Sequence, residues 1–301
     1  MKFLRHCCLA IFVAVVVPMD AGARTPSPAA EPPPSPAVWR VSDADSSVYL
    51  FGSMGLSPHG ASWRSRAVGR AIDASEILWL EASVDDPAAQ AAANEIFNKE
   101  GMLPTGAQLS SLLPADAAAA IDATAVAAGF TPAAIEPLKP WSAFVLFSSK
   151  IDADATAETV DAAILREARS RGREIRYFET VAESLHRLTG LPQGAQIDIL
   201  ARLIVDFDAQ RADARAGFDA WRIGDLAAAD AHMNQTLRET SPVAYKTLVT
   251  DRVETLAGAI EAVLNAPDTA FISLNASYVV GPGALPETLA ARGYKVERIN
   301  E

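Results

Sequence analysis

Cysteine is nearly absent from this sequence. The chain has 301 residues and two cysteines, Cys7 and Cys8, which are adjacent and close to the start. The rest of the chain therefore forms no disulfide, exposes no reactive thiol and offers no thiolate ligand to a metal ion. Its stability must come from a hydrophobic core, and a composition that is 50% apolar can supply one over about 270 residues.

Apolar runs long enough to span a membrane are also lacking. The run from Cys7 to Val17 has 11 residues, whereas a membrane-spanning helix needs about 20. Lys2 and Arg5 precede this run and the small residues 21–23 follow it, which predicts a secretory signal peptide over residues 1–23. We therefore expect an exported protein, periplasmic or secreted, with no transmembrane segment after signal removal. An uncleaved N-terminal anchor is the alternative.

Basic residues are outnumbered by acidic ones. The chain has 26 Lys and Arg against 37 Asp and Glu, a formal net charge of −11, and loss of residues 1–23 makes the charge more negative. Nucleic-acid backbones and anionic lipid surfaces are bound mainly through Lys and Arg. The charge therefore excludes nucleic acid and anionic membranes as expected partners.

Residues 24–36 are rich in proline, which predicts a stiff, extended spacer and a folded domain over residues 37–301. Short apolar runs in that domain predict strands near both of its ends, with one more near 175–178. Residues 86–148 are rich in Ala and Leu and interrupted by prolines, which predicts four or five short helices. Ser241 as N-cap and Pro242 predict a long helix to about Leu264. We expect one α/β domain with a mixed central sheet, built from N- and C-terminal strands, and a large helical middle section.

The apolar run 48–51 ends at Gly52, Ser53 and Gly55, the pattern of a buried strand that enters a tight loop. Residues 39–81 around it resemble the opening of the TraB/PrgY/GumN family, which is related to the Tiki metalloproteases. The similarity continues through "ARSRGREIRYFET" (168–180), "WRIGDL" (221–226) and the segment 281–296. It thus covers most of the chain beyond residue 37 and implies the family's α/β fold.

The resemblance implies a divalent-metal site made by the histidines of two Gly-x-x-His motifs, assisted by glutamates. In this sequence Gly55 stands in place of the first histidine and Tyr278 in place of the second. The matched positions that keep a carboxylate are Glu81 and Glu179. Glycine has no side chain and a phenol is mostly protonated at pH 7, so neither is a good ligand. His59, four residues beyond Gly55, is a possible substitute ligand and otherwise an exposed loop residue.

Glu81 and Glu179 each end an apolar run, and the resemblance implies that they share a pocket. The alternative is that they are solvated or cap helices. Arg252 falls on the apolar stripe of its predicted helix and matches an arginine of the family, so we expect it to pair with Glu81 or Glu179. A structural ion pair with another acid is the alternative. His186 and His232 have no second ligand nearby in the sequence and are interpreted as structural.

A catalytic metal site usually has three protein ligands. With Gly55 and Tyr278 at the two histidine positions, the sequence favours a catalytically degenerate relative that needs no cofactor. Its expected role is that of a binding or structural protein of the cell envelope, with an unknown ligand or an envelope protein as partner and with Glu81, Glu179 and Arg252 as the retained pocket residues. The alternative is a peptidase-like hydrolase that uses Mn, Co or Zn through an altered ligand set including His59.

Overall fold

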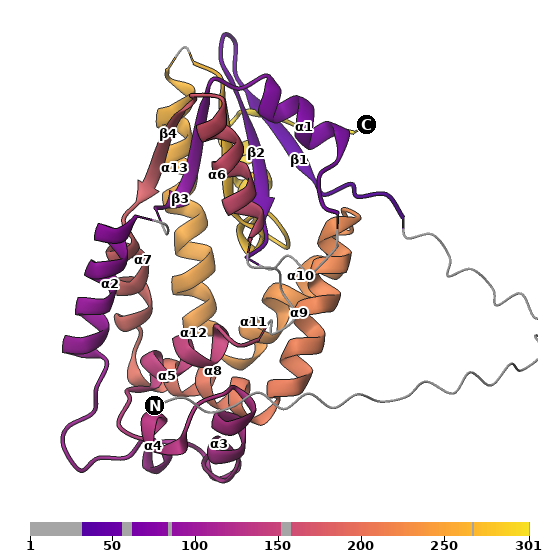
Figure 1. Cartoon of the computed structure of the whole chain (residues 1–301). Coiled ribbons are helices and arrows are strands. Elements are labelled where there is room, and N and C mark those ends of the chain that lie inside the picture. Colours follow the sequence, from indigo (N-terminus) through magenta and orange to yellow (C-terminus); the bar gives the residue numbers. More distant parts are fainter. Residues whose placement is uncertain (1–31, 56–61, 84–85, 152–157, 267, 301) are drawn as a thin grey trace, which may run out of the picture. The chain divides into compact units, whose positions relative to one another are not determined.

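A mixed β-sheet of six strands runs through the computed structural model (Figure 1). The strands are β1 (Val38–Ser42), β2 (Ser47–Ser53), β3 (Ile77–Ala82), β4 (Glu174–Glu179), β5 (Ala270–Asn275) and β6 (Lys295–Arg298). Their order is β4-β3-β5-β2-β1-β6. β1 is antiparallel to both of its neighbours, and β4, β3, β5 and β2 run parallel to one another. N- and C-terminal strands thus share one sheet, which confirms the predicted α/β fold.

The structure describes residues 32–55, 62–83, 86–151, 158–266 and 268–300. One contact unit, Pro33–Glu301, contains the whole sheet. The predicted signal peptide, most of the proline-rich spacer and His59 lie outside the described residues. In the part that is described, no helix has both the length and the apolar character needed to cross a membrane.

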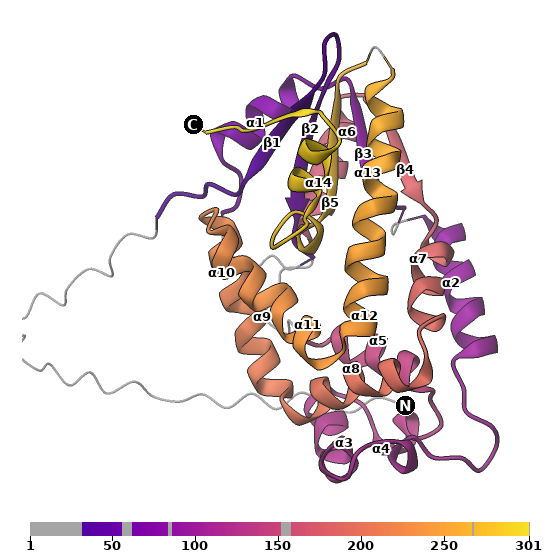
Figure 2. The ribbon, with the colours of Figure 1, turned by 180° about the vertical axis from the view of Figure 1, so that it is seen from behind.

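Helices cover both faces of the sheet. α1 (Arg66–Asp73) and α6 (Val160–Ser170) lie on the face toward the viewer in Figure 1, and α13 (Asp251–Leu264) and α14 (Leu285–Ala291) lie on the opposite face, seen in Figure 2. Each buries an apolar stripe at helical spacing, such as Ile164, Leu165 and Ala168 of α6. Between the layers, the fully buried ring of Phe51 lies 5.7 Å from that of Phe271 and 6.0 Å from that of Trp221. This core fixes the strands whose ends carry the predicted site residues.

The helical middle section lies beyond the carboxyl end of β2 (Figure 1). It has its own apolar core, which includes Ile121, Phe147, Leu200 and Phe207. Its helices are α2 (Pro87–Glu100), η1 (Leu109–Leu112), α3 (Ala115–Ala127), α4 (Pro132–Ile135), α5 (Pro140–Ser148), α7 (Val181–Thr189), α8 (Gln193–Val205), α9 (Phe207–Arg222), α10 (Leu226–Asp230), η2 (Ala231–Gln235), α11 (Thr236–Thr240), α12 (Pro242–Tyr245) and η3 (Lys246–Thr250). The short proline-punctuated helices predicted for residues 86–148 are present.

Two helices contain π-helical turns that the sequence did not predict. The helix expected from Pro242 to Leu264 consists of α12, the π-helical η3 and α13, and a second π-helical turn, η2, follows α10. Ser241 precedes this helix, but the prediction that its side chain caps the helix is wrong. Its buried hydroxyl has no hydrogen-bond partner among the described residues. Such π-helical turns often occur at functional sites.

Candidate functional site

The carboxyl ends of four parallel strands meet at one edge of the sheet. β3 carries Glu81 and β4 ends at Glu179, while β2 ends at Ser53 and β5 at Asn275. Tyr278 follows β5 on the short helix η4 (Ala276–Tyr278). This edge faces the helical section, so side chains from distant parts of the sequence converge there.

Arg252 of α13 lies between the two glutamates. Its Nη2 is 2.8 Å from Oε2 of Glu179 and 3.8 Å from Oε1 of Glu81. The side chains of Arg252 and Glu179 are 6% and 4% exposed, so this is a buried ion pair. The pair that the sequence predicted is therefore present, with Glu179 as the nearer partner. Neither Nε nor Nη2 of Arg252 makes an aligned hydrogen bond within the described residues, so charge is the main attraction.

Arg187 is a second cation at the same place, and sequence reasoning missed it. Its Nη2 donates to Oε1 of Glu179 at 2.7 Å, its Nη1 contacts Oε2, and Oε1 of Glu81 is 3.6 Å away. This two-pronged contact is the geometry that a guanidinium prefers with a carboxylate. The local signal was the capping box of Thr180 and Glu183, which starts α7 directly after β4 and carries Arg187 back toward Glu179.

Tyr278 takes part in the same network. Its hydroxyl donates to Oε1 of Glu81 at 3.2 Å, and the backbone N–H of Asn275 lies 3.4 Å from Oε2. Burial, together with the charge of Glu81, raises the pKa of the Tyr278 phenol, so the phenol remains a proton donor at neutral pH. Burial also raises the pKa of Glu81, an effect that Arg252 opposes and Glu179 reinforces.

The residues present do not fit the divalent-metal site that the resemblance implies. Gly55 offers no ligand atom, Tyr278 offers a protonated phenol, and Glu81 and Glu179 already contact Arg187 and Arg252. Within the described residues, no group of three or more His, Cys, Asp or Glu side chains is placed to hold a metal ion. His59 lies outside those residues.

The two glycines of the first motif have different roles in packing. A Cβ at Gly52 would lie 2.2 Å from Cγ2 of Val279 and 3.0 Å from the Cα of Ala276, whereas one at Gly55 would have no neighbour within 4 Å among the described residues. In addition, Nε1 of Trp221 donates to the carbonyl of Gly52 at 2.6 Å. Gly52 is therefore required for the strand end to approach the Tyr278 segment closely.

We expect Gly52→Ala to destabilise the protein by about 1–3 kcal/mol, because the added methyl group overpacks a close backbone contact. Gly55→Ala is the matched control and should leave stability nearly unchanged. Chemical denaturation of both variants measures the difference. Equal stability of the two variants would contradict the packing role of Gly52.

Asp161, at the start of α6, is a further acid at this edge and is partly buried, and sequence reasoning did not assign it a role. Its carboxylate accepts hydrogen bonds from Oγ of Ser53 at 2.8 Å and from Oγ of Ser273 at 2.7 Å. Burial raises the pKa of Asp161, and the two serine hydroxyls oppose that rise. The side chain ties α6 to β2 and β5, and it lines a cavity of about 380 Å³ together with Glu81 and Tyr278.

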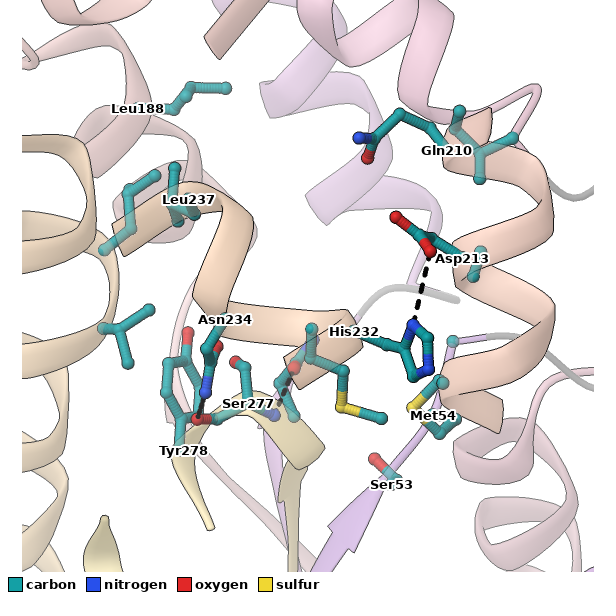
Figure 3. A pocket seen from close by; sticks show the side chains of 18 of the residues that line it. Ser53, Met54, Leu188, Gln210, Asp213, His232, Asn234, Leu237, Ser277 and Tyr278 are labelled. Carbon is teal, nitrogen blue, oxygen red and sulfur yellow. Dashed lines mark hydrogen bonds and ion pairs between the residues drawn. The ribbon is translucent and has the colours of Figure 1, made fainter. Parts of the chain in front are cut away.

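A larger cavity of about 490 Å³ lies between the strand ends and the helical section (Figure 3). Gly55, Arg187 and Tyr278 lie in its wall, beside the ion-pair network. His232, which the sequence suggested was structural, also lines it, and its Nδ1 is 3.3 Å from Oδ1 of Asp213. His186 lies on α7 and is exposed.

Comparison with known proteins supports the resemblance. Searches of curated proteins and of solved structures gave no match. The model of the TraB/PrgY/gumN family matches residues 37–298, which is most of the chain and nearly the whole described unit. The chain therefore belongs to the TraB/PrgY/gumN family.

Proposed function

We propose that this protein is a non-catalytic member of its family that binds a ligand in the 490 Å³ cavity beside the strand ends. The observation that carries the proposal is the contact of Arg187 and Arg252 with Glu81 and Glu179. These two carboxylates are the ones that the resemblance assigns to a metal site, and two cations lie beside them.

The charges of this network balance without a metal. Two carboxylates brought close together repel each other unless one is protonated or a positive charge lies between them. Here two guanidinium groups face two carboxylates, and an arginine keeps its charge at any physiological pH. A divalent cation would have to compete with both arginines and would gain no ligand at Gly55 and only a protonated phenol at Tyr278. These residues suit a rigid cavity wall better than an open coordination site.

The cavity has the size and lining of a ligand site. Small-molecule pockets typically have volumes of about 300–1,000 Å³ and combine a mostly apolar lining with a few polar groups. This cavity has apolar residues such as Leu188, Leu237 and Leu248 and polar ones such as Gln210 and Asn234. With the predicted signal peptide, this favours a role as a binding protein of the cell envelope.

Binding of the neutral apolar dye N-phenyl-1-naphthylamine to the mature protein tests this function. We expect saturable binding that neither EDTA nor added Mn²⁺, Co²⁺ or Zn²⁺ changes. Ala214→Trp should abolish it, because Ala214 lines the cavity on α9 and an indole ring there would fill the space. Ala212→Trp on the exposed side of the same helix is the control and should bind normally.

Two results would overturn the proposal. Dye binding that persists in Ala214→Trp would place the dye elsewhere on the protein. One tightly held metal ion per chain after dialysis would instead support a metal-dependent hydrolase with an altered ligand set.

A further inference from the structure

The cavity contains an acidic group that the ion-pair network does not use. Asp213 extends from α9, and Figure 3 shows it and Gln210 reaching toward the side of the cavity where Leu188 and Leu237 lie. Its Oδ1 is 3.3 Å from Nδ1 of His232, which is its one ion-pair partner among the described residues. The Asp213 side chain is 42% exposed, so its carboxylate remains accessible from the cavity.

The backbone holds His232 against α9. His232 lies on the π-helical turn η2, and a Cβ at Gly217 would be 3.2 Å from the Cβ of His232. Glycine at 217 thus allows the two helices to approach closely, which brings the imidazole to Asp213. When the neutral imidazole donates its Nδ1–H to Oδ1, it orients the carboxylate and leaves the negative charge in place.

Asn234 is a further polar residue of the cavity lining. The side-chain nitrogen of Asn234 donates to Oδ1 of Asp230 and to the carbonyl of Ser277, both at 3.0 Å. Asn234 is only 1% exposed, yet its Oδ1 has no hydrogen-bond partner in the part of the chain that is described. Because that oxygen is buried, a ligand in the cavity does not reach it, and the accessible acidic acceptor of the lining is Asp213.

The cation in the lining is already neutralised. Arg187 contacts Glu179 with both terminal nitrogens and lies 3.6 Å from Glu81, so it does not provide a free positive charge for an anionic ligand. Figure 3 shows the apolar side chains of Leu188 and Leu237 across the cavity from Asp213, and Leu248 and Val249 also line the cavity. The cavity thus combines an oriented carboxylate and an apolar wall.

We propose that this cavity binds a protonated amine carried on an apolar body, with Asp213 as the counter-ion and His232 as the residue that orients it. The inference rests on the proposed ligand-binding function and adds the chemical class of the ligand. The ammonium group lies at the Asp213 carboxylate. The apolar body packs against the leucine side chains opposite.

Calorimetric titration of the mature protein with n-octylammonium, n-octanol and n-octanoate tests this inference. We expect octylammonium to bind about ten-fold or more tightly than the other two, a difference that a single ion pair can supply. Asp213→Asn should weaken octylammonium binding about ten-fold and leave binding of the neutral dye N-phenyl-1-naphthylamine unchanged. Asp219→Asn, which removes the same charge from an exposed position of α9, is the control and should bind octylammonium as the wild type does.

The outcomes separate this inference from the proposed function. Equal affinity for octylammonium and octanol, or unchanged octylammonium affinity in Asp213→Asn, would overturn the amine site. If the dye still binds in that case, the ligand-binding cavity stands and only the ligand class is wrong. If neither the dye nor octylammonium binds to the wild-type protein, both proposals fall.

Discussion

Replacing Arg252 with Met is expected to destabilise the protein by about 3–5 kcal/mol at neutral pH. Methionine keeps much of the volume of the arginine stem, but it leaves Glu179, which is 4% exposed, without one of its two cations. Removing one partner of a buried ion pair typically costs about this much, because the remaining charge stays buried. The loss should therefore exceed that of any surface ion pair of this chain.

The loss in free energy of unfolding caused by Arg252→Met, called the deficit below, should shrink as the pH falls. Burial already raises the pKa of Glu81 above the ordinary value of 4.5, and the charge of Arg252 opposes that rise. Without Arg252, the pKa of Glu81 in the folded state rises further, so the variant pays more than the wild type to keep Glu81 ionised. That extra cost is present at neutral pH and disappears once Glu81 is protonated in both proteins.

Thermal and chemical unfolding of Arg252→Met between pH 8 and 4.5 measures both effects. Arg166→Met is the matched control, since Arg166 forms an exposed ion pair with Glu158 and its loss should have little effect at any pH. A deficit below about 1 kcal/mol for Arg252→Met would show that the pair contributes no more than a surface pair does. A deficit independent of pH would contradict the coupling to Glu81.

Replacing Glu179 with Gln should also cost about 3–5 kcal/mol at neutral pH, because it leaves two guanidinium groups with Glu81 as their nearest acid. The pH dependence should have the opposite sign. Loss of the Glu179 charge removes a repulsion that raises the pKa of Glu81, so Glu81 stays ionised to a lower pH in the variant. An ionised Glu81 therefore destabilises the folded variant less than it destabilises the folded wild-type protein.

The smaller cost of an ionised Glu81 in Glu179→Gln disappears over the pH range in which Glu81 takes up its proton. The loss in free energy of unfolding caused by Glu179→Gln should therefore grow as the pH falls from 8 toward 5. Unfolding experiments on Glu179→Gln at several pH values measure the direction of this change. Glu158→Gln, which replaces an exposed acid, is the control. A deficit that shrinks over this range, as in Arg252→Met, would mean that Glu81 is not the residue that couples the two arginines to pH.

Local patterns in the sequence were sufficient to predict the strands. The hairpin of β1 and β2 follows from two apolar runs around a turn, and the capping box of Thr180 and Glu183 follows from a Thr-x-x-Glu pattern. The lack of a ligand at Gly55 follows from side-chain chemistry alone. The family match over residues 37–298 and the mixed sheet confirm the resemblance and the predicted fold class.

The contacts of Arg187 could not be predicted, because they depend on the direction of α7 after β4. The capping box shows where that helix starts, but not which of its faces turns toward Glu179. The same holds for the π-helical turn η2, which changes the helix phase and turns His232 toward Asp213 on α9. Neither the direction of α7 nor the π-helical turn η2 produces a periodic pattern in the sequence.

The sequence by itself determined the strands, the helical middle section and the degenerate Gly-x-x-His motifs, since each depends on neighbouring residues or on the side chain at one position. Only the tertiary structure decided which side chains surround Glu81 and Glu179. Glu81 meets Tyr278 across 197 residues, and Ser53 meets Asp161 across 108. Such contacts depend on how parallel strands align at one edge and on how helices pack against them. Long-range packing of this kind, rather than local propensity, placed two arginines beside two glutamates.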